Sequence, residues 1–114
     1  FVLERLRLGG EEPICHQTTT VVLEQCPGIE NVDFTNQSLY EVLTKRFNLV
    51  ITRIDHLVRA VAADEYRAEL LKIAVGDPVL LVITTAYIEG GEIIEYSVSY
   101  YRADKYEYST IETG

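Results

Sequence analysis

The sequence predicts an α+β domain in which helices pack on a largely antiparallel β-sheet. Six segments show the alternation or the β-branched composition of strands, and two segments carry apolar residues at helical spacing. Most of these segments are joined by connections of hairpin length, which favours antiparallel neighbours. The 114 residues suffice for one hydrophobic core, so we predict a single domain over residues 1–114.

The first two strands are expected to form a hairpin. Residues 2–8 alternate apolar and polar side chains, Gly9 and Gly10 interrupt this pattern, and residues 14–23 resume an extended β-branched stretch. Pro27 and Gly28 end the hairpin, and residues 29–36 have the Asn, Asp and Thr content of a loop.

Two helices follow from capping signals. Ser38 and Glu41 have the spacing of a capping box, in which the Ser38 hydroxyl accepts from a first-turn N–H, ahead of apolar residues at helical spacing. The second helix is predicted to begin near Asp64 as its N-cap and to end before Gly76. Its predicted buried residues are Ala68, Leu70, Leu71 and Ile73.

The remaining strands are predicted over residues 49–61, 79–88 and 92–101, and a short last strand over residues 106–111. Residues 89–91 form a glycine-rich turn that suits an antiparallel hairpin.

Alternation divides residues 93–102 into two faces. Ile94, Tyr96, Val98 and Tyr100 resemble a core face, whereas the other face carries Glu95, Ser97, Ser99 and Tyr101 and suits the wall of a polar ligand pocket.

Composition restricts the function classes. The chain has 10 Lys and Arg against 18 Asp and Glu, a formal charge of −8, and so lacks the basic surface that binds nucleic acid by itself. No apolar run approaches the length of a membrane span and no signal peptide is recognisable, so we expect a cytoplasmic protein without membrane contact. Because the sequence begins in mid-pattern without Met, we expect it to be part of a longer protein.

Catalytic and metal sites have little support in the sequence. Cys15 and Cys26 are expected to be reduced, and neither has an identifiable base beside it. His16 and His56 lie on different predicted strands without metal-ligand spacing, and His56 is interpreted as a satisfied strand histidine. We therefore predict no catalytic residues, no metal and no cofactor.

Arg5 and Arg7 are the first candidates for ligand binding. They lie two residues apart on one strand, so both guanidinium groups point to one face, roughly 7 Å apart. Paired carboxylates or an anionic ligand such as phosphate would each explain two adjacent cations. Ser38 is first a helix cap, but its helix N-terminus could complete an anion site beside the arginines.

Three further residues could contact a polar ligand. Glu95 could bind ligand hydroxyls or form an ion pair with a strand arginine such as Arg53. Gln17 could bind the same ligand or occupy an exposed strand position. Tyr101 could stack on a ligand or pack within the protein.

The order and spacing of several short motifs resemble the UTRA effector-binding domain of GntR-type bacterial transcriptional regulators of the HutC subfamily. The resemblance covers nearly the whole chain. The motifs are Arg5-Leu6-Arg7, Pro13-Ile14, Pro27-Gly28-Ile29, Ser38 to Leu43, Ile51-Thr52-Arg53, Arg59-Ala60, Ala68 to Leu71, Gly76 to Leu80 and Glu95 to Tyr106.

This resemblance implies a chorismate-lyase-like fold with a pocket for a small-molecule effector, in a homodimeric regulator. It also implies an N-terminal winged helix-turn-helix domain, absent from this chain, through which the regulator contacts operator DNA. Effector binding would shift the placement of the two DNA-binding domains, and we expect the regulator to be a repressor. An enzyme like chorismate lyase and a dimerisation module without a working pocket are the alternatives.

The resemblance also assigns site residues. Arg5, Arg7 and Ser38, with Tyr40 beside them, match positions that hold the phosphate in relatives that bind sugar phosphates, and Glu95 and Tyr101 match positions that contact the sugar. Gln17 stands where relatives often carry a glutamate, so an effector amino group would lose a partner here. The expected effector is a sugar phosphate or another small anion.

Overall fold

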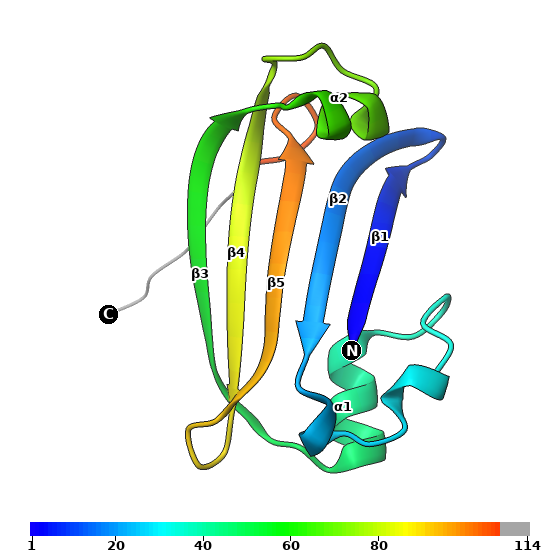
Figure 1. Cartoon of the computed structure of the whole chain (residues 1–114), viewed down its shortest axis with the longest axis vertical. Coiled ribbons are helices and arrows are strands. Elements are labelled where there is room, and N and C mark those ends of the chain that lie inside the picture. Colours follow the sequence, from blue (N-terminus) through cyan, green and yellow to red (C-terminus); the bar gives the residue numbers. More distant parts are fainter. Residues whose placement is uncertain (108–114) are drawn as a thin grey trace.

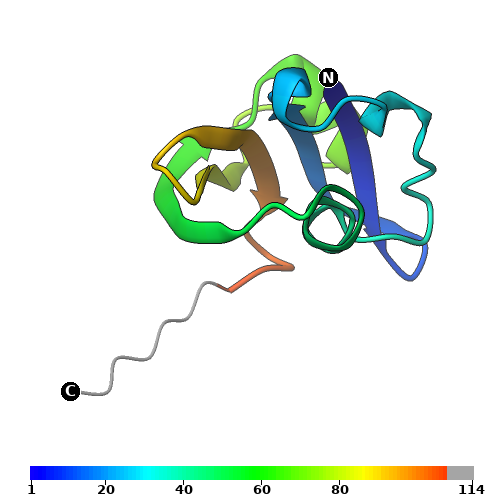
Figure 2. The same cartoon turned by 90° about the horizontal axis from the view of Figure 1, so that it is seen from below.

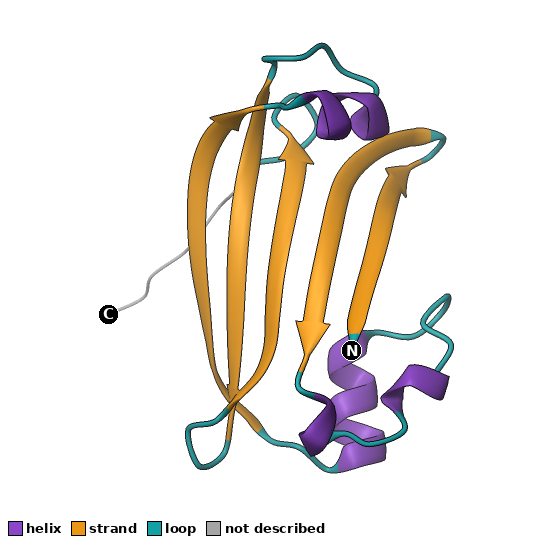
Figure 3. Ribbon diagram, in the orientation of Figure 1, coloured by secondary structure: helices purple, strands orange, loops and turns teal. Residues whose placement is uncertain are grey.

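A computed structural model describes residues 1–107 and shows one five-stranded antiparallel sheet with two α-helices (Figures 1 and 3). The α+β class is therefore confirmed. The strands are β1 (Val2–Gly9), β2 (Glu12–Val21), β3 (Ile51–Ala62), β4 (Pro78–Ile88) and β5 (Ile93–Arg102). The helices are α1 (Leu39–Phe47) and α2 (Glu65–Leu71), and two 3-10 turns span Leu23–Gln25 and Ile29–Asn31.

The strand order is β1-β2-β5-β4-β3, with every neighbouring pair antiparallel. The predicted hairpins β1–β2 and β4–β5 are both present, the first turning at Gly10, whose φ of 66° favours glycine. The central strand β5 pairs with β2 on one side and β4 on the other. Of the predicted last strand over 106–111, residues 106 and 107 are not in a strand, and the rest lies outside the described residues.

The two faces of the sheet differ in what covers them. We call the face that carries Glu95, Ser97 and Ser99 the inner face, and the face that carries Tyr96 and Val98 the outer face. Helix α1 packs on the inner face at one end of the strands, and α2 packs on the outer face at the other end (Figures 1 and 2). A space therefore remains over the inner face beside α1.

Each helix closes its own hydrophobic cluster. Val42 and Leu43 of α1 pack with six other buried residues from the sheet and the 3-10 turns, namely Val21, Cys26, Ile29, Ala86, Ile88 and Ile94. Ala68 and Leu71 of α2 pack with Ala63 and Val79. Helical spacing in the sequence predicts the buried helix residues of both clusters. Leu70, also predicted to be buried, is only half-buried. Helix α2 ends at Leu71, because Lys72 adopts the left-handed conformation.

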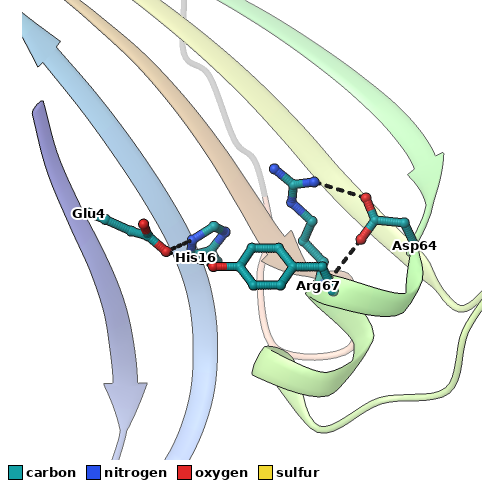
Figure 4. Close-up of polar contacts among 5 residues, drawn as sticks. Glu4, His16, Asp64 and Arg67 are labelled. Atoms are coloured by element: carbon teal, nitrogen blue, oxygen red, sulfur yellow. Dashed lines mark hydrogen bonds and ion pairs between the residues drawn. The ribbon is translucent and has the colours of Figure 1, made fainter.

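A polar cluster attaches α2 to the first hairpin on the outer face (Figure 4). Glu4 Oε1 lies 2.9 Å from Nε2 of the buried His16 and accepts a 2.9 Å hydrogen bond from the Tyr66 hydroxyl. The hydrogen bonds from His16 and Tyr66 lower the pKa of Glu4 below its usual value. The cluster thus links β1, β2 and α2 by groups that all lie away from the inner face.

The structure confirms the predicted cap of α2 but not the predicted cap of α1. Asp64 caps α2 as predicted, accepting a 2.8 Å hydrogen bond from the Arg67 N–H. Ser38 occupies the N-cap position of α1, but its side chain makes no capping hydrogen bond. The predicted capping-box contact of Ser38 is therefore wrong: its backbone is extended, as at Asp64, but its side chain lines a cavity and makes no hydrogen bond to a first-turn N–H.

We expect Asp64→Ala to lower the free energy of unfolding by about 1 kcal/mol, because it removes the capping bond of α2. Ser38→Ala removes no such bond and should cost less than about 0.5 kcal/mol. Urea unfolding of both variants measures the difference. An equal loss in the two variants would show that Ser38 caps α1 in solution.

The structure corrects the interpretation of the two faces of β5. Glu95, Ser97 and Ser99 are buried, whereas Tyr96, on the predicted core face, is 45% exposed. Of the four residues on the predicted core face, only Ile94 is fully buried. Tyr96 is exposed because α2 covers only the other end of the outer face, around Tyr100, whereas on the inner face Tyr40 of α1 lies against Glu95.

Candidate functional site

A cavity of about 590 Å³ opens on the inner face of the sheet beside α1. All seven residues that the sequence singled out line it: Arg5, Arg7, Gln17, Ser38, Tyr40, Glu95 and Tyr101. These residues come from β1, β2, β5, α1 and the N-cap of α1, so residues as far apart in sequence as Arg5 and Tyr101 meet at one site. The fold thus brings the candidate residues together.

The strand register arranges the cavity floor in rows across the sheet, because directly paired residues point to the same face. One row runs from β1 to β3 through Arg5, Gln17, Ser99, Val82 and Val58. The next row runs through Leu3, Thr19, Ser97, Thr84 and His56. The β1 side of the floor is therefore cationic, and its centre consists of hydroxyl and amide groups.

The cationic side is formed by Arg5 and Arg7. Among residues 1–107 neither guanidinium forms an ion pair, so the paired-carboxylate explanation is wrong for the part of the chain that the structure describes. Arg7 donates from Nε and from a terminal nitrogen to Gln17 Oε1, at 3.3 and 3.1 Å. Arg5 lies 5.6 Å from the ring centroid of Phe34, and burial, together with the nearby charge of Arg7, lowers the pKa of Arg5.

Gln17 links the arginines to the centre of the floor. Its side-chain oxygen accepts from Arg7, and its amide nitrogen donates to the Ser99 hydroxyl at 3.0 Å. A glutamine can make both bonds because it carries an acceptor and a donor. Gln17 therefore fixes the orientation of Arg7 without neutralising its charge. The alternative that Gln17 is only an exposed strand residue is wrong, because its side chain bonds two residues of the cavity.

Glu95 is the only carboxylate among the described residues that line the cavity, and it is 3% exposed. The Tyr40 hydroxyl donates to Glu95 Oε1 at 2.6 Å, and the Ser97 hydroxyl donates to Oε2. Ser97 also shares a 2.9 Å hydrogen bond with Thr19. The alternative ion pair with Arg53 is wrong, because Arg53 pairs with Asp55.

The Tyr40 contact ties α1 to the central strand. Tyr40 lies in the first turn of α1 and bonds a residue fifty-five positions away on β5. Burial and the Glu95 carboxylate raise the pKa of Tyr40 well above its usual value, so the phenol stays protonated and donates. The network holds the N-terminal end of α1, including Ser38, over the cavity.

Tyr101 closes the end of the cavity beyond Arg7. Its ring stacks on Tyr106, with centroids 4.0 Å apart and planes inclined by 21°, so at least part of the ring packs within the protein. Burial raises the pKa of Tyr101 to about 12. Burial likewise raises the pKa of the neighbouring Cys15 thiol to about 11, which leaves it unreactive at neutral pH.

Sequence reasoning missed part of the lining. Thr19 and Thr84 were foreseeable from strand alternation, but the contributions of Phe34 and of Thr35 to Gln37 come from a loop without periodicity. His56 and Tyr106 also line the cavity. Within residues 1–107 no group of three metal-ligating side chains converges, and no helix is long and apolar enough to cross a membrane.

Comparison with known proteins agrees with this architecture. The UTRA domain family matches residues 1–107. The transcriptional repressor NagR of Bacillus subtilis is 27% identical over 106 residues, covering 93% of this chain and 43% of the relative. The transcriptional regulator GmuR of the same organism is 29% identical over 111 residues, covering 97% of this chain and 46% of the relative. The chain thus spans less than half the length of these relatives.

Solved structures share the fold. A GntR-family transcriptional regulator from Enterococcus faecalis superposes with a TM-score of 0.88 at 28% identity, covering 97% of this chain and 79% of that one. The effector domain of PhnF from Mycobacterium smegmatis gives a TM-score of 0.90 at 23% identity, covering 99% of this chain and 69% of that one. The second likeness concerns the fold alone.

Proposed function

The chain belongs to the UTRA domain family and is an effector-binding domain of the GntR type, and on this premise we propose that its cavity binds a sugar phosphate or another small anion. The observation that carries the proposal is the presence of two guanidinium groups without carboxylate partners, among the described residues, at one side of a polar cavity. Arginine's planar fork matches phosphate oxygens.

The N-terminus of α1 supports the same assignment. Ser38 lines the cavity with Arg5 and Arg7, and its hydroxyl is not used as a cap. The first-turn N–H groups of a helix lack helical partners and attract anions. In our proposal the phosphate lies between the two arginines and Ser38, with Tyr40 beside it.

The rest of the ligand would lie on the polar floor. Ser97, Ser99 and Thr19 offer hydroxyls, and Gln17, Glu95 and Tyr101 offer amide, carboxylate and phenol groups. Such a surface suits a polyhydroxylated ligand better than an apolar one, because an alkyl group would displace water from the free lone pairs of these groups without replacing its hydrogen bonds.

We further propose that the whole protein is a cytoplasmic homodimeric repressor of the HutC subfamily. Its operator contacts would come from an N-terminal winged helix-turn-helix domain, since this chain has a formal charge of −8. Effector binding would change DNA affinity by favouring one arrangement of the two DNA-binding domains. NagR is named a repressor, which supports this part of the proposal.

Calorimetric titration of the 114-residue chain tests the proposed ligand class. The ligands are glucose 6-phosphate, fructose 6-phosphate, glucose 1-phosphate and unphosphorylated glucose. We expect at least one hexose phosphate to bind and glucose to bind much more weakly. Absence of binding by every phosphate would overturn the proposal, and formation of product from chorismate would favour the enzyme alternative.

Gln17→Glu should weaken phosphate binding about fivefold, because the new carboxylate would neutralise Arg7, which Gln17 now orients without charge. The titration with the hexose phosphate that binds tightest measures this change. Thr20→Glu is the matched control, because it adds the same charge to the outer face of the same strand. Equal weakening in both variants would contradict a local effect at Arg7.

A further inference from the structure

Between positions 54 and 60, the edge strand β3 contributes one polar side chain to the inner face. Four of its residues between positions 54 and 60 point to this face, and three of them, Ile54, Val58 and Ala60, are apolar. The fourth is His56, which lines the cavity. Its interpretation as a satisfied strand histidine accounts for only one of its two ring nitrogens.

Thr84 on β4 holds the His56 ring. Directly opposite across the β3–β4 pair, the Thr84 hydroxyl shares a 3.0 Å hydrogen bond with His56 Nδ1. The other ring nitrogen, Nε2, has no hydrogen-bond partner among residues 1–107. An imidazole fixed through one nitrogen presents the other as a donor or acceptor of defined direction.

His56 and the arginines lie on opposite sides of the cavity. Arg5 is on β1 and His56 on β3, the two edge strands, so four inter-strand steps of about 4.8 Å would separate their backbones in a flat sheet. The curvature seen in Figure 2 shortens that span. A free phosphate ion at the arginines cannot reach His56, whereas a ligand that extends along the row of Thr19, Ser97 and Thr84 can.

We propose that His56, positioned by Thr84, is a second recognition point for the effector. The effector is then an extended phosphorylated compound that carries a hydroxyl or carbonyl oxygen at the end away from its phosphate. This inference rests on the proposed function, because it takes the phosphate to lie at Arg5 and Arg7. His56 is exposed when the cavity is empty, so its free nitrogen can bind water; an apolar far end that covered it would remove that water and leave the nitrogen without a partner.

Titration of His56→Phe against inorganic phosphate, the tightest-binding hexose phosphate and hexyl phosphate tests the inference. Phenylalanine keeps a ring of similar size but cannot hydrogen-bond. We expect about a fivefold loss for the hexose phosphate and changes below about twofold for the two other ligands. His56→Gln keeps a hydrogen-bonding group and should recover part of the loss.

Leu57→Ala is the matched control, because Leu57 follows His56 on the same strand but points to the outer face and is 48% exposed. It should leave all three affinities unchanged. Equal hexose phosphate affinity in the wild type and in His56→Phe would overturn the role of His56 and leave the proposed function intact. Failure of the wild type to bind any phosphorylated ligand would overturn both.

Discussion

Replacing Arg5 and Arg7 together by alanine is expected to weaken binding of a hexose phosphate at least about 100-fold. Each guanidinium supplies charge-assisted hydrogen bonds, worth about 1.5–3 kcal/mol apiece to a charged group. Among the described residues no carboxylate competes for either arginine. Calorimetry on the double variant and on each single variant measures the loss, and the two single losses need not add, because Arg5 and Arg7 are close neighbours.

The control for this prediction is the double variant Arg53→Ala/Arg59→Ala. Both of these arginines are exposed on the outer face of β3, so their removal changes the net charge by the same amount without touching the cavity. We expect its affinity to stay within about twofold of the wild type. Undiminished binding by the Arg5/Arg7 variant would show that the anion site is elsewhere.

Leu43→Ala should lower the free energy of unfolding by about 2–5 kcal/mol, the range for removing a large side chain from a packed core. Leu43 is fully buried and lies in the cluster that joins α1 to the inner face. Urea unfolding followed by far-UV circular dichroism gives the difference. Because Leu43 also holds α1 beside the cavity, the folded variant should bind the hexose phosphate more weakly.

Leu57→Ala serves again as the control, since an exposed leucine contributes little to the core. Its unfolding free energy should change by less than about 0.5 kcal/mol. A loss below about 1 kcal/mol in Leu43→Ala would mean that α1 is not packed on the sheet as described.

Periodicity and capping signals predicted the strands and helices of this fold because both are local properties of the sequence. The Asp64 cap and the buried positions Ala68 and Leu71 follow directly from helical spacing. Alternation also separated the two faces of β5, but it could not show which face the protein covers. That depends on the placement of α1 and α2, which are distant in sequence from β5.

The candidate site was predictable where residue chemistry and the family resemblance coincide, as at Arg5 and Arg7. The partners of these residues were not predictable, because they depend on strand register. Gln17 meets Arg7 and Ser99 because β2 lies between β1 and β5. Glu95 meets Tyr40 rather than Arg53 because α1 packs on the inner face. The loop around Phe34 carries no pattern that would place it over Arg5.

A crystal structure of the chain with the hexose phosphate that binds tightest tests the central claim most directly. We predict the phosphate between the guanidinium groups of Arg5 and Arg7 and the N-terminus of α1 at Ser38, with the sugar over Ser97 and Ser99. A phosphate bound on the outer face, or a sugar phosphate in the cavity without contact to either arginine, would contradict the account.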